Sequence, residues 1–188
     1  MTDPPAVDPP GPGWRETESS RATALDVGPV EVTVATVVFE DADLRGRVAA
    51  ATGLDYPWRF AFAGRVDVPG SASSRALGRL VTDRARSGFA DRLRERGFAA
   101  VERAGTRTLD GTEAARYVAR VAVEEVTVGA EGWLAVRPEA VHERSFRLAG
   151  GAYPRSVEGA PDEETGTALA DLFDPGAFRA DTVAFLGR

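Results

Sequence analysis

The side chains available for chemistry form a restricted set, because the 188-residue chain has no Lys, no Cys and a single histidine, His142. Without an amine side chain there is no Schiff-base or phosphate-binding lysine. Without a thiol there is no cysteine nucleophile, thiolate metal site or disulfide. Any Ser-His-acid arrangement would have to use His142. This residue stands in the polar stretch 139–144, and the sequence has no Gly-x-Ser-x-Gly motif, so we interpret it as a solvated or locally paired loop residue.

Metal binding would have to rely on carboxylates. The closest candidates form two groups, Glu40, Asp41 and Asp43 in one and Asp162, Glu163 and Glu164 in the other. Each group stands at the start of a predicted helix, where carboxylates interact favourably with the helix dipole and the free amides. Neither has the spacing of a calcium loop. We therefore expect no metal site and no cofactor, and the alternative of a carboxylate-dependent, metal-assisted hydrolase lacks an identifiable pair of acids.

Positive charge is concentrated in the middle of the chain. Residues 65–108 hold 10 Arg and 5 acids, whereas acids outnumber Arg on both sides of this segment. At ~100° per helical residue, Arg75, Arg79 and Arg86 fall within about 40° of one another, away from the apolar face. Arg presents a planar fork of donors that suits carboxylate or phosphate. This stripe is therefore a candidate binding site for an acidic protein or a small anion.

The opposing interpretation is that these Arg side chains lie over the acidic surface of the same molecule. Exposed pairs such as Arg79 with Asp83 would each contribute ~0 to 1 kcal/mol. Nucleic acid is not an expected partner, because the net charge is −6 and no basic segment is interleaved with aromatic residues.

Strand and helix signals follow one another in groups. The expected strands are 14–25, 30–39, 58–68, 98–109, 112–128, 133–136 and 145–148. The expected helices are a short one ending at Gly53, a long one from Ser71, Ser73 or Ser74 to Gly97, and a C-terminal pair, 165–173 and 175–186. Gly88 is a candidate break in the long helix. Segment 113–125 also fits helical spacing, but its Val and Thr content favours a strand.

Two glycine groups and one aromatic run refine this outline. Gly129 and Gly132 are expected to form a turn, and Gly150-Gly151 is expected to end the last strand. Trp58, Phe60 and Phe62 recur at every second residue, which predicts three rings on one sheet face. Together with Trp133 and Tyr153 they could line a ligand pocket, but we interpret them as core.

The expected strands occur mostly in hairpin-linked groups, so the sequence predicts an α+β fold with a largely antiparallel β-sheet flanked by helices in two or three layers. The long helix ends at Gly97-Phe98, and the strands after it carry Asp110-Gly111 and Ala114–Tyr117. This arrangement resembles the PsbP-like sandwich over Trp58–Pro154. The resemblance implies an antiparallel sheet between helices and a binding or assembly module rather than an enzyme.

The overall composition is acidic, with 29 Asp and Glu against 23 basic residues, all of them Arg, and a pI near 5.0. It resembles that of cytosolic proteins from extremely salt-loving archaea. A protein from a GC-rich actinobacterium would have a similar amino-acid composition. At molar salt the Debye length falls to ~3 Å, so repulsion among surface carboxylates is largely screened.

The chain start has a different composition from the rest. Residues 1–13 hold Pro4, Pro5, Pro9, Pro10 and Pro12, so we expect a disordered tail, with a docking peptide as the alternative, followed by a single domain over 14–188. The tail lacks the basic and apolar regions of a signal peptide, and no apolar run approaches the ~20 residues of a membrane span. We therefore expect a cytoplasmic binding or assembly module that engages its partner through the Arg-rich helix and does not contact a membrane.

Overall fold

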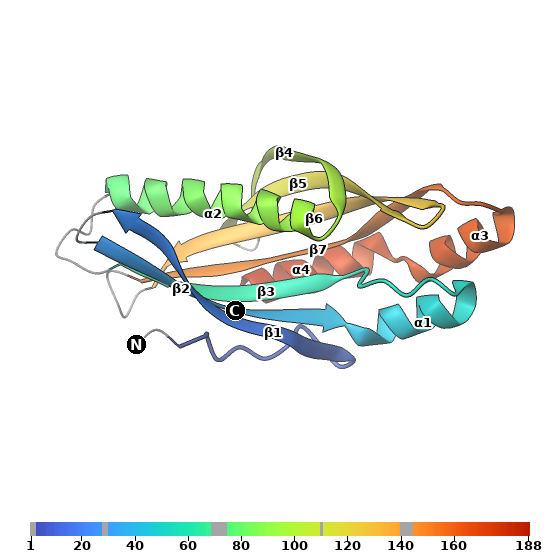
Figure 1. Ribbon diagram of the computed structural model, residues 1–188, viewed down its shortest axis with the longest axis horizontal. Coiled ribbons are helices and arrows are strands. Elements are labelled where there is room, and N and C mark those ends of the chain that lie inside the picture. The colour runs from blue at the N-terminus through green and yellow to red at the C-terminus, as the bar shows by residue number, and fades with distance from the viewer. Residues whose placement is uncertain (1–2, 28–29, 69–74, 110, 140–144) are drawn as a thin grey trace.

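A seven-stranded antiparallel sheet forms the centre of the molecule, with strand order β1-β2-β3-β7-β6-β5-β4 (Figure 1). The computed structural model describes residues 3–27, 30–68, 75–109, 111–139 and 145–188. The strands are β1 (Trp14–Val27), β2 (Val30–Asp41), β3 (Phe60–Asp67), β4 (Phe98–Leu109), β5 (Thr112–Val123), β6 (Val126–Pro138) and β7 (Ser145–Gly159). The helices are α1 (Ala42–Thr52), α2 (Arg75–Glu95), α3 (Glu163–Leu172) and α4 (Pro175–Leu186).

The helices lie on both faces of the sheet. The long helix α2 covers one face, whereas α4 packs on β7 and β6 from the other face, and α1 and α3 contact each other at one end of the molecule (Figure 1). The two runs of consecutive strands, β1 to β3 and β4 to β7, meet in the middle where β3 pairs with β7. The predicted α+β fold with a largely antiparallel sheet between helices is therefore confirmed.

The strand interpretation of segment 113–125 is also confirmed, because these residues lie in β5 and the hairpin that follows it. The helix ends follow their sequence signals as well. The Asp41 side chain accepts from the Leu44 amide at the start of α1, and Gly53 ends this helix in the left-handed region, with φ of 79°. The expected starts of the long helix at Ser71, Ser73 and Ser74 lie outside the described residues.

The expected break at Gly88 was wrong, because α2 is one continuous helix of 21 residues. A Cβ built on Gly88 meets no atom within 4 Å. The helix is held by its packed neighbours on either side, so one residue with weak helix propensity does not interrupt it.

Replacement of Gly88 by alanine should therefore raise the free energy of unfolding by about 1 kcal/mol, since alanine loses less backbone entropy in a helix. Replacement of Gly53 by alanine is the contrasting control. It should lower the free energy of unfolding by about 1 kcal/mol, because Gly53 has a positive φ. Urea unfolding followed by circular dichroism measures both, and a stabilising Gly53→Ala would contradict this account.

The predicted boundaries of the last strands were wrong. The chain turns at Glu124-Glu125 and then runs as one strand, β6, through Gly129 and Gly132. Glu124 has a φ of 53°, which glutamate adopts rarely, so this turn carries no sequence signal. Strand β7 likewise continues through Gly150-Gly151 to Gly159.

These central glycines allow aromatic rings to lie directly on the sheet. A Cβ on Gly132 would stand 3.3 Å from the Phe89 ring, and one on Gly150 would stand 2.5 Å from the Phe62 ring. Glycine inside a strand often marks such a close approach. The prediction of three rings on one face was also wrong, because Trp58 precedes β3 and packs on Phe173 at a centroid distance of 5.4 Å.

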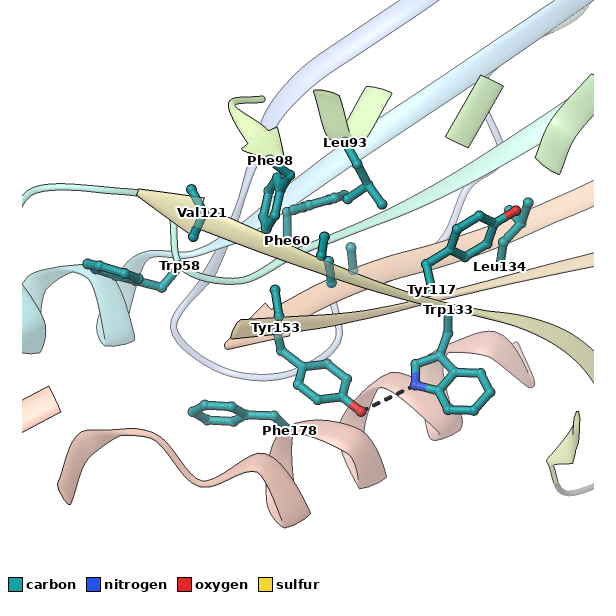
Figure 2. Close-up of a cluster of buried hydrophobic side chains, with 14 of the residues drawn as sticks. Trp58, Phe60, Leu93, Phe98, Tyr117, Val121, Trp133, Leu134, Tyr153 and Phe178 are labelled. Carbon is teal, nitrogen blue, oxygen red and sulfur yellow. Dashed lines mark hydrogen bonds between the residues drawn. The ribbon is translucent and has the colours of Figure 1, made fainter. Parts of the chain in front are cut away.

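Figure 2 shows that Tyr117 and Leu134 point from the sheet toward α2, whereas Trp133 and Tyr153 point to the opposite side, where Phe178 of α4 lies. Trp133 and Tyr153 are almost completely buried. Side chains alternate between the two faces along each strand, so each face has an apolar layer beneath its own helix.

The N-terminal segment contacts both the edge of the sheet and the C-terminus. Asp3 pairs with Arg21 of β1 at 2.8 Å, and Arg188 donates to the carbonyls of Asp8, Pro9 and Pro10. The division into a disordered tail over 1–13 and one domain over 14–188 stays a prediction. In the described part of the chain, no helix has the length and apolar character needed to cross a membrane.

Candidate functional site

A groove of about 620 Å³ lies between α2 and the sheet. Its floor is formed mainly by the α2-facing side chains of β2 and β3. The apolar lining residues are Val32, Val34, Val38, Phe60, Phe62, Val66, Val68, Leu77, Leu80, Val81, Ala85, Phe89, Leu134 and Leu148. Leu80 stands at the rim with 47% of its surface exposed, which is unusual for a large apolar side chain in this structure.

The groove exists because α2 is held toward one side of the sheet. Phe89 packs on Tyr117 of β5 at a centroid distance of 5.0 Å and on Phe62 at 5.6 Å. The helix also contacts β4 and β6. The valine side chains of β2 line the floor of the groove, and α2 residues such as Leu77 and Val81 form its opposite wall.

Two tyrosine hydroxyls bind backbone carbonyls of α2 and of Arg96, the residue that follows this helix. Tyr117 donates to the carbonyl of Arg86 at 3.1 Å, and Tyr56 donates to the carbonyl of Arg96 at 3.0 Å. Burial raises the pKa of Tyr56 to about 12, and burial also raises the pKa of Tyr117. Both hydroxyls therefore keep their protons at neutral pH and remain donors.

Charge is concentrated toward the C-terminal end of α2. The charged side chains that line the groove in the described structure are those of Arg84, Asp91, Arg92 and Arg96. Asp91 is paired with Arg94 at 2.8 Å, so the lining offers mainly cations to a ligand. Leu77 and Leu80 mark the opposite, apolar end, and the groove is therefore amphipathic along the helix axis.

Arg92 and Arg96 connect this end of α2 to the strands. Arg92 lies 3.3 Å from a carboxylate oxygen of Glu18 on β1, and Arg96 lies 3.4 Å from one of Glu40 on β2. The Arg96 guanidinium also lies over the Phe60 ring, 4.4 Å from its centroid. Both ion pairs are longer than the ~2.7 to 2.9 Å of a strong charge-assisted hydrogen bond.

A second polar cluster lies buried on the α4 face. Glu131 accepts from Trp133 Nε1 at 3.0 Å, from the Tyr153 hydroxyl at 2.5 Å and from Arg116 Nε at 2.8 Å. Burial would raise the pKa of Glu131, but these hydrogen bonds and the Arg116 charge outweigh it, so the pKa is lowered. Because both carboxylate oxygens are engaged by donors, this group holds the core together and is not poised to take a proton.

Arg59 forms the third polar cluster and joins three elements. It pairs with Asp41 at 2.9 Å and with Asp181 of α4 at 3.0 Å. Its guanidinium lies between the rings of Trp14 and Phe178, at 4.9 and 4.1 Å from their centroids. These contacts connect the start of β1, the start of α1 and α4, and they leave the cation enclosed by protein.

Of the predicted stripe of Arg75, Arg79 and Arg86, the two residues whose side chains the structure describes, Arg79 and Arg86, do not line the groove. Arg79 is exposed on α2, and Arg86 is half-buried and lies 3.8 Å from Asp83 and 3.4 Å from Glu113. Arg75 is the first residue of α2, and its side chain lies outside the described part of the structure. Binding of a partner by this stripe stays a prediction.

The predicted carboxylate groups are used in local structure. Asp41 and Asp162 cap α1 and α3, and the hydrogen bonds from Thr165 lower the pKa of Asp162. Glu40 pairs with Arg96 and with Arg45. Among the described residues, no group of three or more His, Cys, Asp or Glu side chains is placed to hold a metal ion. His142 lies outside those residues.

Sequence reasoning missed Arg84, Arg92 and Arg96 as site residues. The available signal was their position on the helix: at ~100° per residue Arg84 and Arg92 fall on the same side as Val81 and Gly88. An arginine on the apolar side of an amphipathic helix must either be paired or face a cavity. The predicted stripe of Arg75, Arg79 and Arg86 was instead chosen because it lies away from the apolar residues of the helix.

The fold and the groove define an antiparallel α+β sandwich in which one helix and the sheet enclose an amphipathic ligand-sized site. Residues 4–184 match the family model described as Domain of unknown function (DUF6517), and the chain belongs to this family. The comparisons found no match among curated proteins and none among solved structures.

Proposed function

We propose that this chain is a binding module rather than an enzyme, and that the groove beneath α2 is its ligand site. The observation that carries the proposal is the groove itself. Its volume of about 620 Å³ lies within the ~300 to 1,000 Å³ of small-molecule sites. Like such sites, it combines a predominantly apolar lining with a few charged groups at one end.

The Arg-rich helix remains central to this function, as the sequence suggested, but it acts through the flank that faces the groove. A separate contact of Arg75, Arg79 and Arg86 with an acidic protein is compatible with the groove, because Arg79 and Arg86 are not among the lining residues. The alternative of a carboxylate-dependent hydrolase stays a prediction, although Asp91 is the one acid among the described residues that line the groove, and Arg94 pairs with it.

A groove-filling substitution tests the proposal. Nile red is an uncharged dye whose emission moves to shorter wavelength in apolar surroundings, and we expect it to bind saturably at one site. Gly88 lines the groove, and a Cβ there meets no atom within 4 Å, so Gly88→Phe can place its ring in the groove without displacing the backbone. This variant should reduce dye affinity at least about tenfold, the equivalent of ~1.4 kcal/mol.

The matched control is Gly46→Phe. Gly46 also lies in a helix, is exposed, and has no atom within 4 Å of a built Cβ, but it belongs to α1, away from the groove. This control should bind the dye as the native chain does. Dye binding that is equal in the native chain and Gly88→Phe would place the ligand elsewhere and contradict the proposal.

A further inference from the structure

We propose that the ligand of this groove is a single-chain anionic amphiphile, with its carboxylate head at Arg92 and Arg96 and its apolar chain directed toward Leu77 and Leu80. This inference rests on the proposed function and specifies the chemistry of its ligand. The asymmetry of the groove carries it. The end near α2's C-terminus offers guanidinium groups, whereas the opposite end is lined by side chains such as Leu77, Val66 and Val68.

The shape of the groove favours an extended ligand. From Leu77 to Arg96 the helix advances about 28 Å, at ~1.5 Å per residue. The floor of the groove includes side chains at every second position of β2, namely Val32, Val34, Thr36 and Val38, next to those of β3. An extended, mostly apolar floor suits an alkyl chain, because each methylene removed from water contributes favourably.

The charged end already accepts carboxylates, and this observation selects the head group. Arg92 and Arg96 each hold one glutamate carboxylate, at 3.3 and 3.4 Å, which is long for a charge-assisted pair. Glu18 is 42% exposed and its partner Arg92 is 39% exposed, so this pair is screened by solvent and opens at little cost. A ligand carboxylate can replace Glu18 and accept hydrogen bonds from the guanidinium groups of both arginines.

Arg84 adds a further cation to the same wall of the groove. Within the described part of the chain, no carboxylate lies within salt-bridge distance of Arg84, whereas Asp91 is neutralised by Arg94. Three arginines and one acid line the described groove, and the Arg92 and Arg96 pairs with Glu18 and Glu40 are long, so an anion complements this lining better than a cation does.

Displacement of Nile red by matched alkyl ligands tests the inference. Dodecanoate and 1-dodecanol have the same chain and differ in charge, and acetate supplies the carboxylate without the chain. We expect dodecanoate to displace the dye at about tenfold lower concentration than dodecanol, because only the carboxylate forms charge-assisted hydrogen bonds with the guanidinium groups. Acetate should not displace it. Equal displacement by the acid and the alcohol would overturn the inference.

Two variants test whether Arg92 and Arg96 bind the carboxylate head group. The double variant Arg92→Gln with Arg96→Gln should weaken dodecanoate binding to the level of dodecanol and leave dodecanol unchanged. The control Arg79→Gln removes an exposed charge from the same helix outside the groove and should change neither ligand. Loss of both ligands in the double variant, with loss of the unfolding transition, would mark a structural role for the two arginines and overturn the assignment.

The outcomes separate the two proposals. If neither dodecanoate nor dodecanol displaces the dye, and the dye itself does not bind in the groove, the proposed function fails. If both displace it equally, the groove is a binding site but not one for an anion. Light scattering tests whether a second copy of the chain fills the groove. A native dimer that Gly88→Phe converts to a monomer would show this and would overturn the inference.

Discussion

Replacement of Glu131 by leucine is expected to lower the free energy of unfolding by about 3 kcal/mol, the low end of the ~3 to 5 kcal/mol for breaking a buried ion pair. The carboxylate is buried and accepts from Trp133, Tyr153 and Arg116. Leucine leaves these donors without their acceptor inside the core. The loss stays near the low end because Trp133 can still donate to the Tyr153 hydroxyl, 3.2 Å away. Urea unfolding followed by tryptophan fluorescence measures the change.

The control is Glu158→Leu, which removes the carboxylate partner of Arg120. That pair is exposed, so its loss should cost no more than ~1 kcal/mol. A Glu131→Leu variant as stable as Glu158→Leu would show that the buried network contributes little.

The effect of Glu131→Leu on the free energy of unfolding depends on pH, and the direction of this dependence follows from the pKa of Glu131. The pKa of Glu131 is lowered in the folded protein, so its stabilising contribution is complete above the unfolded value of about 4.3. It is lost as pH falls below that value toward the folded pKa. The difference in stability between the native chain and Glu131→Leu should therefore be constant near pH 7 and shrink in acid. A difference that grows on acidification would contradict the assignment.

Replacement of Gly151 by alanine is expected to lower the free energy of unfolding by about 3 kcal/mol. Gly151 lies in β7 opposite Ala61 of β3, and a Cβ there would stand 2.6 Å from the Phe60 carbonyl oxygen and 3.2 Å from the Ala61 Cα. Both are backbone atoms of the neighbouring strand, so no side-chain rotation can make room. The central pairing of β3 with β7 must open instead, and this pairing joins the two halves of the sheet.

Gly159→Ala provides the matched control in the same strand. A Cβ on Gly159 has its nearest neighbour, Thr127 Cβ, at 3.9 Å, which is ordinary van der Waals contact. This variant should be neutral or slightly stabilising, because alanine has less backbone entropy to lose on folding. Equal midpoints of the two variants in urea would mean that the sheet accommodates the methyl group at Gly151.

The groove and the glycines are connected through the packing of α2. The Phe89 ring approaches the sheet closely because Gly132 lacks a side chain, and the Phe62 ring does so because Gly150 lacks one. Together with Tyr117 these rings fix the position of α2 above the sheet. The β2 and β3 side of the same face is therefore left with an apolar floor and space above it, which is the feature that the proposed function uses.

Local signals in the sequence determined most of the secondary structure. The hairpin of β1 and β2, the caps of α1 at Asp41 and Gly53, and the start of α4 at Pro175 follow from residues a few positions apart. Such signals report backbone preferences that act within one turn or one strand. The composition also excluded lysine and cysteine chemistry, because the chain contains neither residue.

The tertiary structure decided where glycines and arginines act. Gly132, Gly150 and Gly151 have the composition of turns, but they lie within strands because a ring or a neighbouring strand occupies the place of the side chain. Arg92 and Arg96 are helix-surface residues by sequence, yet they line the groove because Phe89 positions α2 above the sheet. Both outcomes depend on contacts between residues far apart in the chain. Periodicity places Arg92 on the same side of the helix as Val81, but it cannot show that this side faces a groove.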